Sequence, residues 1–521
     1  MLTVSGAENQ SVGAKNRFII NQLCGLVTLV AGRGLRGQFS CIFGLDCASR
    51  APHLHGCRVF ARRLYFPGMS DLLEDAAKRA SRYLKTLGSR SVAPHNEAVA
   101  ALAGFDRAFP THTSSAESVL AELDEIGSPA TMASAGGRFF GFVIGGALPA
   151  TVAANWLATA WDQNAGLVVS SPTNAALENV SLRWMKDIFH LPVQSAGGFV
   201  TCATAANFSA LAAARHALLA RAGWDVEAQG LFGAPPLTVV VGDEVHASAQ
   251  KALSLVGFGR NRVVRVPVDT QGRMRLDAFP DVDERTIVCV QAGNVNSGAF
   301  DPILEICERA HSSGAWVHVD GAFGMWAAAA PARAHLARGV EAADSWATDA
   351  HKWLNVPYDS GLVFTRDADA LRKAMSVGGA YLAQDEDRVP YQYTPDFSRR
   401  ARGIEVWAAL RQLGRSGLAD LIERTCRYAG EFAEGLRAAG YQVLNDVVLN
   451  QVLVSFGSAE RTREVIDRVQ RDGTCWCGGT VWQGQAAMRI SVSSWATAQS
   501  DVDLSLASIL RAASVTGTQA S

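Results

Sequence analysis

The chain has no excess of charge of either sign. It carries 48 Lys and Arg residues against 49 Asp and Glu residues in a total of 521. A strongly basic or acidic chain would be attracted to nucleic acid or to a charged membrane surface, and this balance gives no such reason. We therefore expect neither partner, and a small zwitterionic ligand fits the composition better.

Long apolar runs are also absent. No run reaches the roughly 18 residues that a membrane-spanning helix requires. The most apolar stretch near the start, residues 19–32, is interrupted by Asn21 and Gln22. Because Lys15 and Arg17 precede it, this stretch faintly resembles a signal peptide, and that alternative stays open. The simpler expectation is a cytoplasmic protein.

The ten cysteines lack the paired CxxC spacing of a zinc site. Cys41, Cys47 and Cys57 lie near His53 and His55, but their spacing matches no familiar set of metal ligands. We therefore expect no metal, and scattered free thiols indicate a reducing compartment.

Residues 1–68 show no sustained helical or strand period, which predicts a poorly structured N-terminal extension. The natural start is then expected at Met69. A helical segment is expected over 69–124, beginning at Ser70 as N-cap, with Asp71 and Glu74 placed to suit the positive end of the helix dipole.

Residues 125–395 alternate short apolar runs with helical stretches. The runs at 237–241, 286–290 and 315–319 are rich in valine and isoleucine, as in strands buried on both faces of a mainly parallel sheet. This pattern predicts an α/β large domain. Residues 396–521 are expected to form a smaller α+β domain, with a long helical stretch first, strands at 451–456 and 487–492, and a last helix from about Thr497.

Lys352 lies in the segment DSWATDAHKWLN, residues 344–355, where its neighbours are mostly apolar. Removal from water lowers the pKa of a lysine, and a neutral amine can condense with an aldehyde. Taken alone, the residue could equally be a lysine at a strand end that reaches water.

Asp320 ends a predicted strand within HVDGA, residues 318–322. Carboxylates at strand ends of α/β sheets lie where ligands bind. A carboxylate against a pyridine nitrogen would keep that nitrogen protonated and make the ring an electron sink. A helix cap is the alternative explanation for one isolated aspartate at this place.

Two further segments could contact a planar phosphorylated ligand. The stretch 197–215 is a turn of small residues that leads into an alanine-rich helix, where Ala203 and Thr204 could bind a phosphate at the helix N-terminus. In the stretch 242–252, His246 follows a strand and could stack on a flat ring. Each feature alone is common, and a histidine at such a junction is often only a cap.

Taken in chain order, these segments resemble the group II pyridoxal-phosphate (PLP) decarboxylases. This family includes the aromatic-L-amino-acid, glutamate, histidine and diaminobutyrate decarboxylases. The resemblance covers roughly residues 80–510, and the motifs HVDGA and DAHKWLNVPYDSG carry most of it. It implies the aminotransferase-like PLP-dependent transferase fold (fold type I), with a seven-stranded, mainly parallel sheet in the large domain. It also implies a homodimer with active sites shared between subunits.

The resemblance assigns roles to single residues. Lys352 would bind the cofactor covalently, Asp320 would pair with its pyridine nitrogen, and His246 would stack on the ring. Asp349 stands where the aromatic-acid enzymes have asparagine, and its charge would repel a phosphate. The further cofactor contacts that the resemblance implies are Ala203, Thr204, Asn294, Ala322, Asp349 and His351.

The implied reaction is loss of carbon dioxide from an L-amino acid whose amine has displaced Lys352. Tyr381, in the glycine-rich stretch 377–382, matches the family's mobile-loop tyrosine and would return a proton to Cα, with His246 nearby. A tyrosine exposed on a surface loop is the structural alternative. A carbon–carbon lyase, an aldehyde-forming relative and a noncatalytic PLP-binding homologue also stay open, although Tyr381 and His246 favour simple decarboxylation.

The substrate is suggested by the resemblance alone. Phe142 keeps an aromatic residue at an expected pocket position, whereas Gly145 and Asn164 do not. A pocket with Asn164 would need hydrogen-bonding partners and would accept a bare aromatic ring less well. An aromatic L-amino acid is therefore the first expectation, and a polar one such as glutamate or 2,4-diaminobutyrate stays open.

Overall fold

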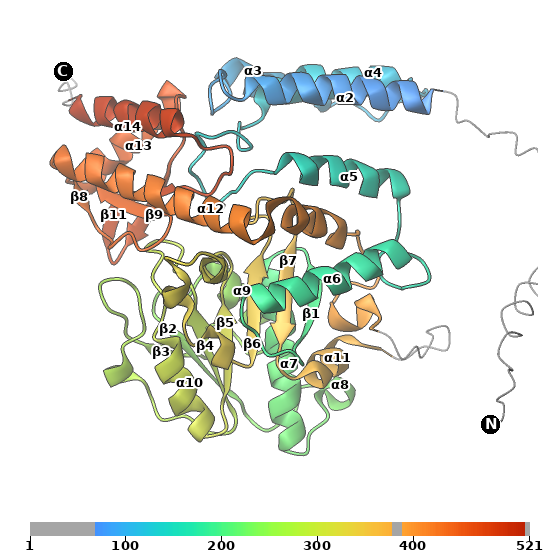
Figure 1. Cartoon of the computed structure of the whole chain (residues 1–521), viewed down its shortest axis with the longest axis vertical. Coiled ribbons are helices and arrows are strands. Elements are labelled where there is room, and N and C mark those ends of the chain that lie inside the picture. Colours follow the sequence, from blue (N-terminus) through green and yellow to red (C-terminus); the bar gives the residue numbers. More distant parts are fainter. Residues whose placement is uncertain (1–67, 378–387, 516–521) are drawn as a thin grey trace, which may run out of the picture. The chain divides into compact units, whose positions relative to one another are not determined.

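The computed structural model describes residues 68–377 and 388–515, all within the compact unit Gly68–Ser521. Two β-sheets and the helices around them make up this part of the chain (Figure 1). The helices are α2 (Met69–Thr86), α3 (Asn96–Ala101), α4 (Ala116–Glu122), α5 (Pro149–Trp161), α6 (Pro172–Ile188), α7 (Ala203–Arg221), α8 (Val226–Gln229), α9 (Ala247–Leu255), α10 (Ile303–Ser312), α11 (Ala368–Met375), α12 (Gly403–Ala438), α13 (Ala459–Asp472) and α14 (Gln499–Ser514). The strands are β1 (Ala196–Val200), β2 (Thr238–Gly242), β3 (Val264–Val266), β4 (Thr286–Gln291), β5 (Trp316–Asp320), β6 (Ser345–Asp349), β7 (Gly361–Thr365), β8 (Gln442–Val443), β9 (Gln451–Ser455), β10 (Gly478–Trp482) and β11 (Gln485–Ser491).

The larger sheet has seven strands in the order β1-β7-β6-β5-β4-β2-β3. Strands β2 to β6 pair in parallel, and only β7 runs antiparallel to its neighbours β1 and β6. This confirms the expected α/β class with a mainly parallel seven-stranded sheet. The three strands expected from apolar runs coincide with β2, β4 and β5 to within one residue at each end.

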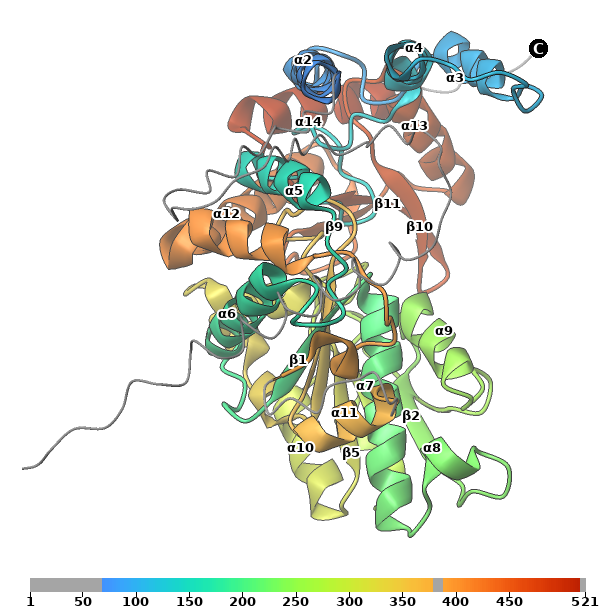
Figure 2. The same cartoon turned by 90° about the vertical axis from the view of Figure 1, so that its right-hand side faces the viewer.

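Helices cover both faces of this sheet, and the side chains of each strand alternate between them. In β4, Val288 and Val290 pack in the cluster that contains α6 and α10, while Ile287 and Cys289 pack in the cluster that contains α7 and α9. Figure 2 shows α6 on one side of the strands and α7 and α9 on the other. Each such buried aliphatic side chain contributes about 1.5–3 kcal/mol.

The smaller sheet has four antiparallel strands in the order β10-β11-β9-β8. A separate apolar cluster joins its strands β9 and β11 to α13, α14 and the C-terminal half of α12. These elements agree with the strands and the last helix expected after residue 396. The exact boundary between the two domains stays a prediction.

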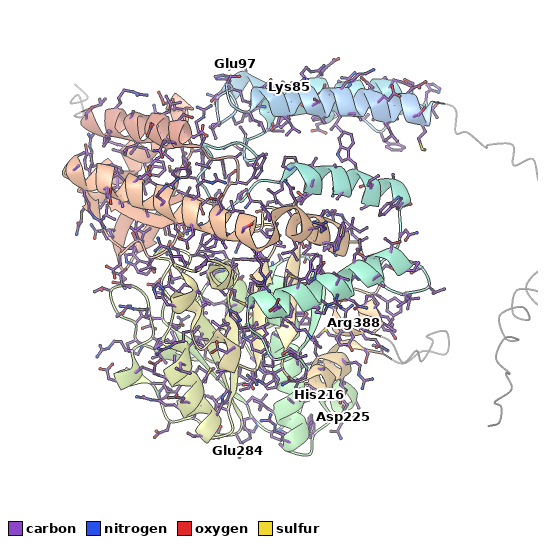
Figure 3. All side chains as sticks on the ribbon, viewed as in Figure 1. Lys85, Glu97, His216, Asp225, Glu284 and Arg388 are labelled. Carbon is purple, nitrogen blue, oxygen red and sulfur yellow. The ribbon has the colours of Figure 1, made fainter. Side chains whose placement is uncertain are left out.

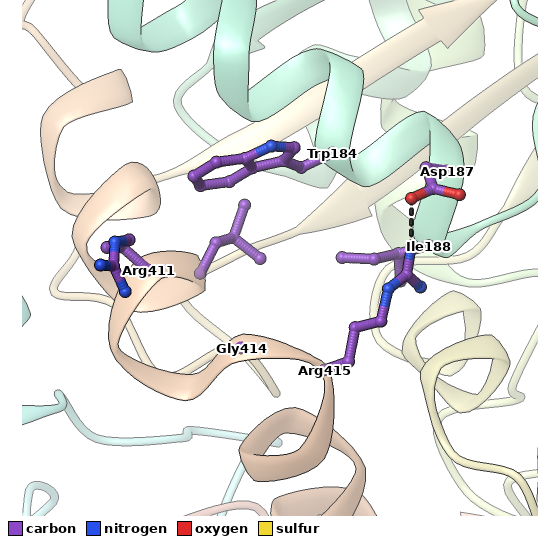
Figure 4. Close-up of a pocket in the computed structure, with 7 residues that line it drawn as sticks. Trp184, Asp187, Ile188, Arg411, Gly414 and Arg415 are labelled. Carbon is purple, nitrogen blue, oxygen red and sulfur yellow. Dashed lines mark hydrogen bonds and ion pairs between the residues drawn. The ribbon is translucent and has the colours of Figure 1, made fainter.

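Helix α12 contains a kink at Gly414, whose φ of 58° and ψ of −170° are not helical. A cavity of about 350 Å³ lies between this kink and α6 (Figure 4). Trp184, Leu410 and Arg411 are among its lining residues, and Arg415 forms an ion pair with Asp187 at one side. None of the residues that line this cavity belongs to the sequence-predicted site.

Helix α2 begins at Met69, so the predicted N-cap at Ser70 is wrong. Gly68 occupies the N-cap with a φ of 91°, and its carbonyl accepts a hydrogen bond of 3.0 Å from the Leu72 amide. A glycine takes this left-handed conformation at little cost, which lets the helix begin earlier. No residue of α2 is buried within the described part of the chain.

Candidate active site

Several of the sequence-predicted residues, among them Asp320, Asp349 and Lys352, meet at one edge of the large sheet. The strand register places Asp320 opposite Gln291 and Ala347, and Asp349 opposite Gly361. Because β4, β5 and β6 are parallel, their carboxyl ends meet at this edge, which is where ligands bind in open α/β sheets. Helix α7 begins beside it, three residues after the end of β1.

Lys352 is largely buried, with 16% of its side chain exposed, and its Nζ lies 3.2 Å from Oδ2 of Asp349. Its backbone is held in place by close packing: a Cβ added to Gly145 would lie 1.8 Å from the Lys352 carbonyl oxygen. Asn355 fixes the same loop, since its amide group donates to the Trp353 carbonyl at 2.8 Å and accepts from the Trp495 amide at 2.8 Å. The structure thus brings predicted residues Gly145 and Lys352 together.

Asp349 occupies part of the phosphate-binding site that is predicted at the N-terminus of α7. Its Oδ1 accepts a hydrogen bond of 2.6 Å from the backbone N–H of Ala203, the first residue of α7. Its Oδ2 faces Lys352, and His351 Nε2 lies 3.7 Å from the same oxygen. A carboxylate suits a helix N-terminus because the helix dipole is positive there. Asp349, which stands where the aromatic-acid enzymes have asparagine, therefore places its own carboxylate where the phosphate of the cofactor is expected.

The N-terminus of α7 nevertheless keeps donors for a ligand. Within the described residues, the backbone N–H groups of Thr204 and Ala205 have no acceptor, and the Thr204 hydroxyl takes part in no hydrogen bond. Unpaired N–H groups at a helix start are a common seat for phosphate. Thr204 is thus free to bind a phosphate, whereas the Ala203 N–H already donates to Asp349.

Asp320 is buried and both of its oxygens accept hydrogen bonds from the protein. Oδ2 accepts from the Asn207 side chain at 3.0 Å, and Oδ1 accepts from the Ala322 amide at 3.3 Å. The Ala322 carbonyl in turn accepts from the Asp349 amide at 2.9 Å, which ties the ends of β5 and β6 together. Sequence reasoning missed Asn207, whose spacing within α7 gives no sign of its partner on β5.

His246 caps α9 and also faces the charged groups of the site. Its Nδ1 lies 2.7 Å from the Ser248 hydroxyl and accepts from the Ser248 amide at 3.2 Å. Burial lowers the pKa of His246, the negative charge of Asp320 opposes that shift, and the positive charge of Lys352 adds to it. The imidazole is therefore neutral near pH 7, and the cap and the site are two roles of one residue.

Two residues that sequence reasoning did not single out lie close to this group. Arg489 on β11 is near enough to lower the pKa of His246, and it donates to Asn296 Oδ1 at 3.1 Å. Among the ion pairs of the described residues it has no acidic partner. Tyr358 is exposed and stacks on His351 with ring centroids 4.3 Å apart. Sequence reasoning missed Arg489 because an arginine in a strand of alternating residues is not distinguished from an ordinary surface residue.

The predicted substrate residues have different surroundings. Phe142 lies three residues before Gly145, with a φ of 54° and its ring centroid 5.3 Å from that of Trp476. Asn164 is exposed and contacts Ser398, to whose hydroxyl it donates at 3.2 Å, rather than the residues around Lys352 in this chain. Phe142 is thus exposed and three residues from the glycine that packs on the lysine loop, and Asn164 forms no hydrogen bond with that loop in this chain.

Asn294 and Tyr381 complete the list of predicted residues. Asn294 is buried, and its Oδ1 accepts from the amides of Asn296 and Ser297 at 2.8 and 3.2 Å, so it shapes the turn that presents Asn296 to Arg489. Its contact with a cofactor stays a prediction. Tyr381 lies outside the described residues, which resume at Arg388, where the side chain donates to the Gly197 carbonyl at 2.8 Å (Figure 3).

The residues present fit pyridoxal phosphate. Lys352 supplies an amine for the aldehyde, Asp320 supplies a buried carboxylate for the ring nitrogen, and Thr204 supplies unpaired donors for the phosphate. Within the described part of the chain no group of His, Cys, Asp and Glu is arranged to hold a metal ion. The donor set is that of an organic cofactor with a carbonyl, a basic ring nitrogen and an anionic tail.

The chain is similar to known proteins over most of its length. The family described as "Pyridoxal-dependent decarboxylase conserved domain" matches residues 98–457. Tryptophan decarboxylase 1 of Oryza sativa subsp. japonica is 27% identical over 463 residues, which cover 81% of this chain and 89% of that protein. Phenylacetaldehyde synthase of Arabidopsis thaliana is 26% identical over 364 residues, covering 64% of this chain and 73% of the synthase. The crystal structure of Oryza sativa TDC with PLP and tryptamine superposes with a TM-score of 0.79 at 24% identity, over 87% of this chain and 99% of that one.

Proposed function

The chain belongs to the pyridoxal-dependent decarboxylase family, and we propose that it removes the α-carboxylate of an aromatic L-amino acid. It is a PLP-dependent carboxy-lyase that converts an L-amino acid to carbon dioxide and the amine. The observation that supports an aromatic substrate is Phe142, which lies three residues from the glycine packed against Lys352 and whose ring contacts Trp476 at a tilt of 31°. Relatives named for tryptophan and aromatic amino acids support the same choice.

The cofactor would be held by Lys352 at its aldehyde, by Asp320 at its ring nitrogen and by the start of α7, including Thr204, at its phosphate. His246 and Ala322 would lie against its two faces. Bound pyridoxal phosphate supplies an electron-withdrawing ring that accepts the electron pair left when carbon dioxide departs.

The remaining work belongs to the protein's own side chains. Arg489, a cation without an acidic partner among the described ion pairs, would bind the substrate carboxylate and orient the bond that breaks. Neutral His246 and the Tyr381 hydroxyl would deliver a proton to Cα, so one proton is taken up for each carbon dioxide released. Protonation of Cα is the step that separates amine formation from aldehyde formation.

We further propose that the protein is a homodimer. Helix α5 exposes Trp156, Leu157 and Trp161 by 43%, 54% and 46%, and α2 exposes Met69 and Leu73 by 55% each. Contiguous exposed apolar residues on a soluble chain usually mark a surface that another protein covers. Covering the C-terminal end of α5 would bring Asn164 close to the second subunit, which is how it would reach a substrate.

Two observations bear on location. In residues 68–377 and 388–515, no helix has both the length and the apolar character to cross a membrane. The six cysteines of the same region are all free thiols. Free thiols are typical of a reducing compartment, which supports a cytoplasmic location.

One assay tests the proposed function. Purified protein with PLP is given each L-amino acid, and carbon dioxide, amine, aldehyde and dioxygen consumption are measured. Aromatic amino acids should give the highest kcat/KM, with amine and carbon dioxide in equal amounts. Turnover of glutamate or 2,4-diaminobutyrate alone would contradict the aromatic assignment. Aldehyde with dioxygen consumption would identify an aldehyde-forming enzyme, and no turnover at all would identify a binding protein.

The role of Tyr381 is tested by Tyr381→Phe, which removes one hydroxyl and keeps the ring. Amine output should fall by roughly 100-fold or more, the scale of a lost general acid, while PLP content is unchanged. Aldehyde, ammonia and peroxide should replace part of the amine, with dioxygen as oxidant. Unchanged amine output would mean that His246, and not Tyr381, donates the proton to Cα.

A further inference from the structure

A line of buried polar side chains runs from the start of β5 to the carboxylate at its end. Trp316 Nε1 lies 2.9 Å from Ser345 Oγ, Ser345 Oγ lies 2.9 Å from His318 Nδ1, and His318 Nε2 lies 2.9 Å from Asn207 Oδ1. Asn207 Nδ2 then donates to Asp320 Oδ2 at 3.0 Å. The five side chains are between 0% and 7% exposed, so water does not compete for these bonds.

The strand geometry explains how the line is built. Trp316, His318 and Asp320 are alternate residues of β5, so their side chains point to the same face of the sheet. Ser345 is the register partner of His318 on β6, and Asn207 comes from α7, which covers that face. Three elements thus contribute to one continuous chain of hydrogen bonds.

The carboxylate end fixes the direction of the bonds that lead to His318, and the indole end is compatible with that direction. An indole N–H can only donate, so Ser345 Oγ accepts from Trp316 and its own proton is free to donate to His318 Nδ1. At the other end an ionised carboxylate can only accept, so Asn207 presents its amide N–H to Asp320 and its oxygen to His318 Nε2.

The Asp320 end requires His318 to carry its proton on Nε2, which leaves Nδ1 free to accept from the Ser345 hydroxyl. That form is the neutral imidazole, and burial lowers the pKa of His318 to about 4, so the ring carries one proton near pH 7. The neutral ring therefore accepts from Ser345 at Nδ1 and donates to Asn207 at Nε2. Aligned hydrogen bonds of this kind polarise one another and stabilise the negative charge of the last acceptor.

We propose that this relay, from Trp316 through Ser345, His318 and Asn207, holds Asp320 in its ionised, acceptor-only form and thereby keeps the cofactor ring nitrogen protonated. The inference rests on the proposed use of pyridoxal phosphate and assigns these four residues as positioning residues. A proton on either oxygen of Asp320 would face an N–H donor, of Asn207 or of Ala322. The ionised form is the one that its surroundings fit.

Other titratable groups near Asp320 cannot replace the relay. His246 is neutral for the reason given above. The thiol of Cys289 on β4 is kept protonated, because burial and the charge of Asp320 raise its pKa to about 12. Lys352 and Arg489 lie close enough to His246 to lower its pKa, whereas the hydrogen bonds to the Asp320 oxygens in the described structure come from Asn207 and Ala322. The relay contacts Asp320 directly, through the hydrogen bond that Asn207 donates to its Oδ2.

The test uses the holoenzyme reconstituted with PLP labelled with ¹⁵N at the ring nitrogen. The ¹⁵N chemical shift and the cofactor absorbance are followed against pH, and both report the proton on the ring without any turnover. Asn207→Leu, which removes the last donor, should lower the proton affinity of the ring nitrogen about tenfold or more. Ser345→Ala should lower this proton affinity by a smaller factor, and Trp316→Phe by a smaller factor still.

Ser209→Ala is the matched control, since Ser209 is equally buried on α7 but donates to the Ala205 carbonyl, outside the relay. It should leave the ¹⁵N shift at its wild-type value. Wild-type shifts in Ser345→Ala, Trp316→Phe and PLP-bound Asn207→Leu would overturn the proposal, and the first two keep it testable if Asn207→Leu does not fold. Wild-type protein that binds no PLP would instead overturn the proposed function. PLP binding with altered ¹⁵N shifts but no turnover would support the relay and contradict only decarboxylation.

Discussion

The carboxylate of Asp349 bridges to the amine of Lys352 at 3.2 Å while its other oxygen holds the first N–H of α7. A phosphate at the start of α7 would meet this charge at close range, and two like charges about 4 Å apart repel by about 4 kcal/mol at an effective dielectric constant of 20. Asp349→Asn removes the charge, keeps an acceptor for Ala203 and adds a donor. We expect PLP to bind about tenfold more tightly, measured by equilibrium dialysis with the apoprotein.

Asp359→Asn is the matched control for this change. Asp359 lies on the same loop, is 40% exposed at its side chain, and pairs with Arg402 at 2.9 Å rather than with α7. Its substitution should leave the Kd for PLP unchanged. Weaker PLP binding by Asp349→Asn would mean that the carboxylate assists the cofactor, for example by holding Lys352.

Lys352→Ala is expected to abolish carbon dioxide release and to leave the fold intact. The side chain forms one ion pair and lies at the sheet edge outside the apolar core, so its loss removes the reactive amine without opening that core. The variant should lose the absorbance of covalently bound PLP. After borohydride reduction and denaturation, no PLP should remain attached to the protein. Its thermal midpoint should stay within about 4 °C of the wild type. Carbon dioxide release at the wild-type rate would exclude the proposed mechanism.

Gly145→Ala should displace the lysine loop. The added Cβ would lie 1.8 Å from the Lys352 carbonyl oxygen, so the backbone of one segment must shift. We expect at least a tenfold loss of kcat and a lower PLP content at saturating cofactor, with a far-ultraviolet spectrum like the wild type. Gly430→Ala in α12 is the control, because nothing lies within 4 Å of its added Cβ. Equal activity of the two variants would contradict the packing described for Gly145.

His318 makes stability depend on pH. Burial lowers its pKa to about 4 in the folded protein, against roughly 6.5 when unfolded. Between these values only the unfolded chain binds the proton, so the free energy of unfolding falls as the pH is lowered. From pH 7 to pH 5 the loss is about 2 kcal/mol. Asp301 acts in the opposite sense, since burial raises its pKa to about 6 and protonation then favours the folded state.

The contribution of His318 is isolated by comparing variants in urea at pH 7 and pH 5. His318→Asn keeps polar groups at the position but cannot titrate there, so it should lose about 2 kcal/mol less than the wild type over this interval. Asp301 is present in both proteins and cancels. His190→Asn, at an exposed position, should follow the wild type. Identical pH dependence of the wild type and His318→Asn would show that His318 is not buried in its neutral form.

Deleting residues 1–67 should leave PLP content and melting temperature nearly unchanged. The deletion keeps Gly68, whose carbonyl accepts the first hydrogen bond of α2, and the family match begins only at residue 98. Extending the deletion to residue 127 removes α2 and Asp124, which pairs with Arg79 at 3.1 Å, and should weaken self-association in sedimentation. A large loss of PLP-bound protein from the shorter deletion would place the extension within the fold.

The fold class could be predicted because strands buried on both faces need continuous β-branched runs, and those runs are visible in the sequence. Lys352 and Asp320 could be predicted because each lies in a distinctive local motif. Asn207, Ser345 and Arg489 could not, since their roles come from hydrogen bonds and charges between elements far apart in the chain. The start of α2 was missed for a local reason: a glycine in the left-handed region replaced the expected side-chain cap.

The antiparallel pairing of β1 with β7 has a consequence for biosynthesis. It joins residues 196–200 to residues 361–365, so the strand that leads into α7 leaves the ribosome long before its partner exists. At usual rates of translation the interval is on the order of ten seconds or more. During that time the edge of β1 is open to other chains, and contacts of such long sequence separation form slowly. The yield of folded protein should therefore depend on growth temperature and on chaperones that protect nascent chains.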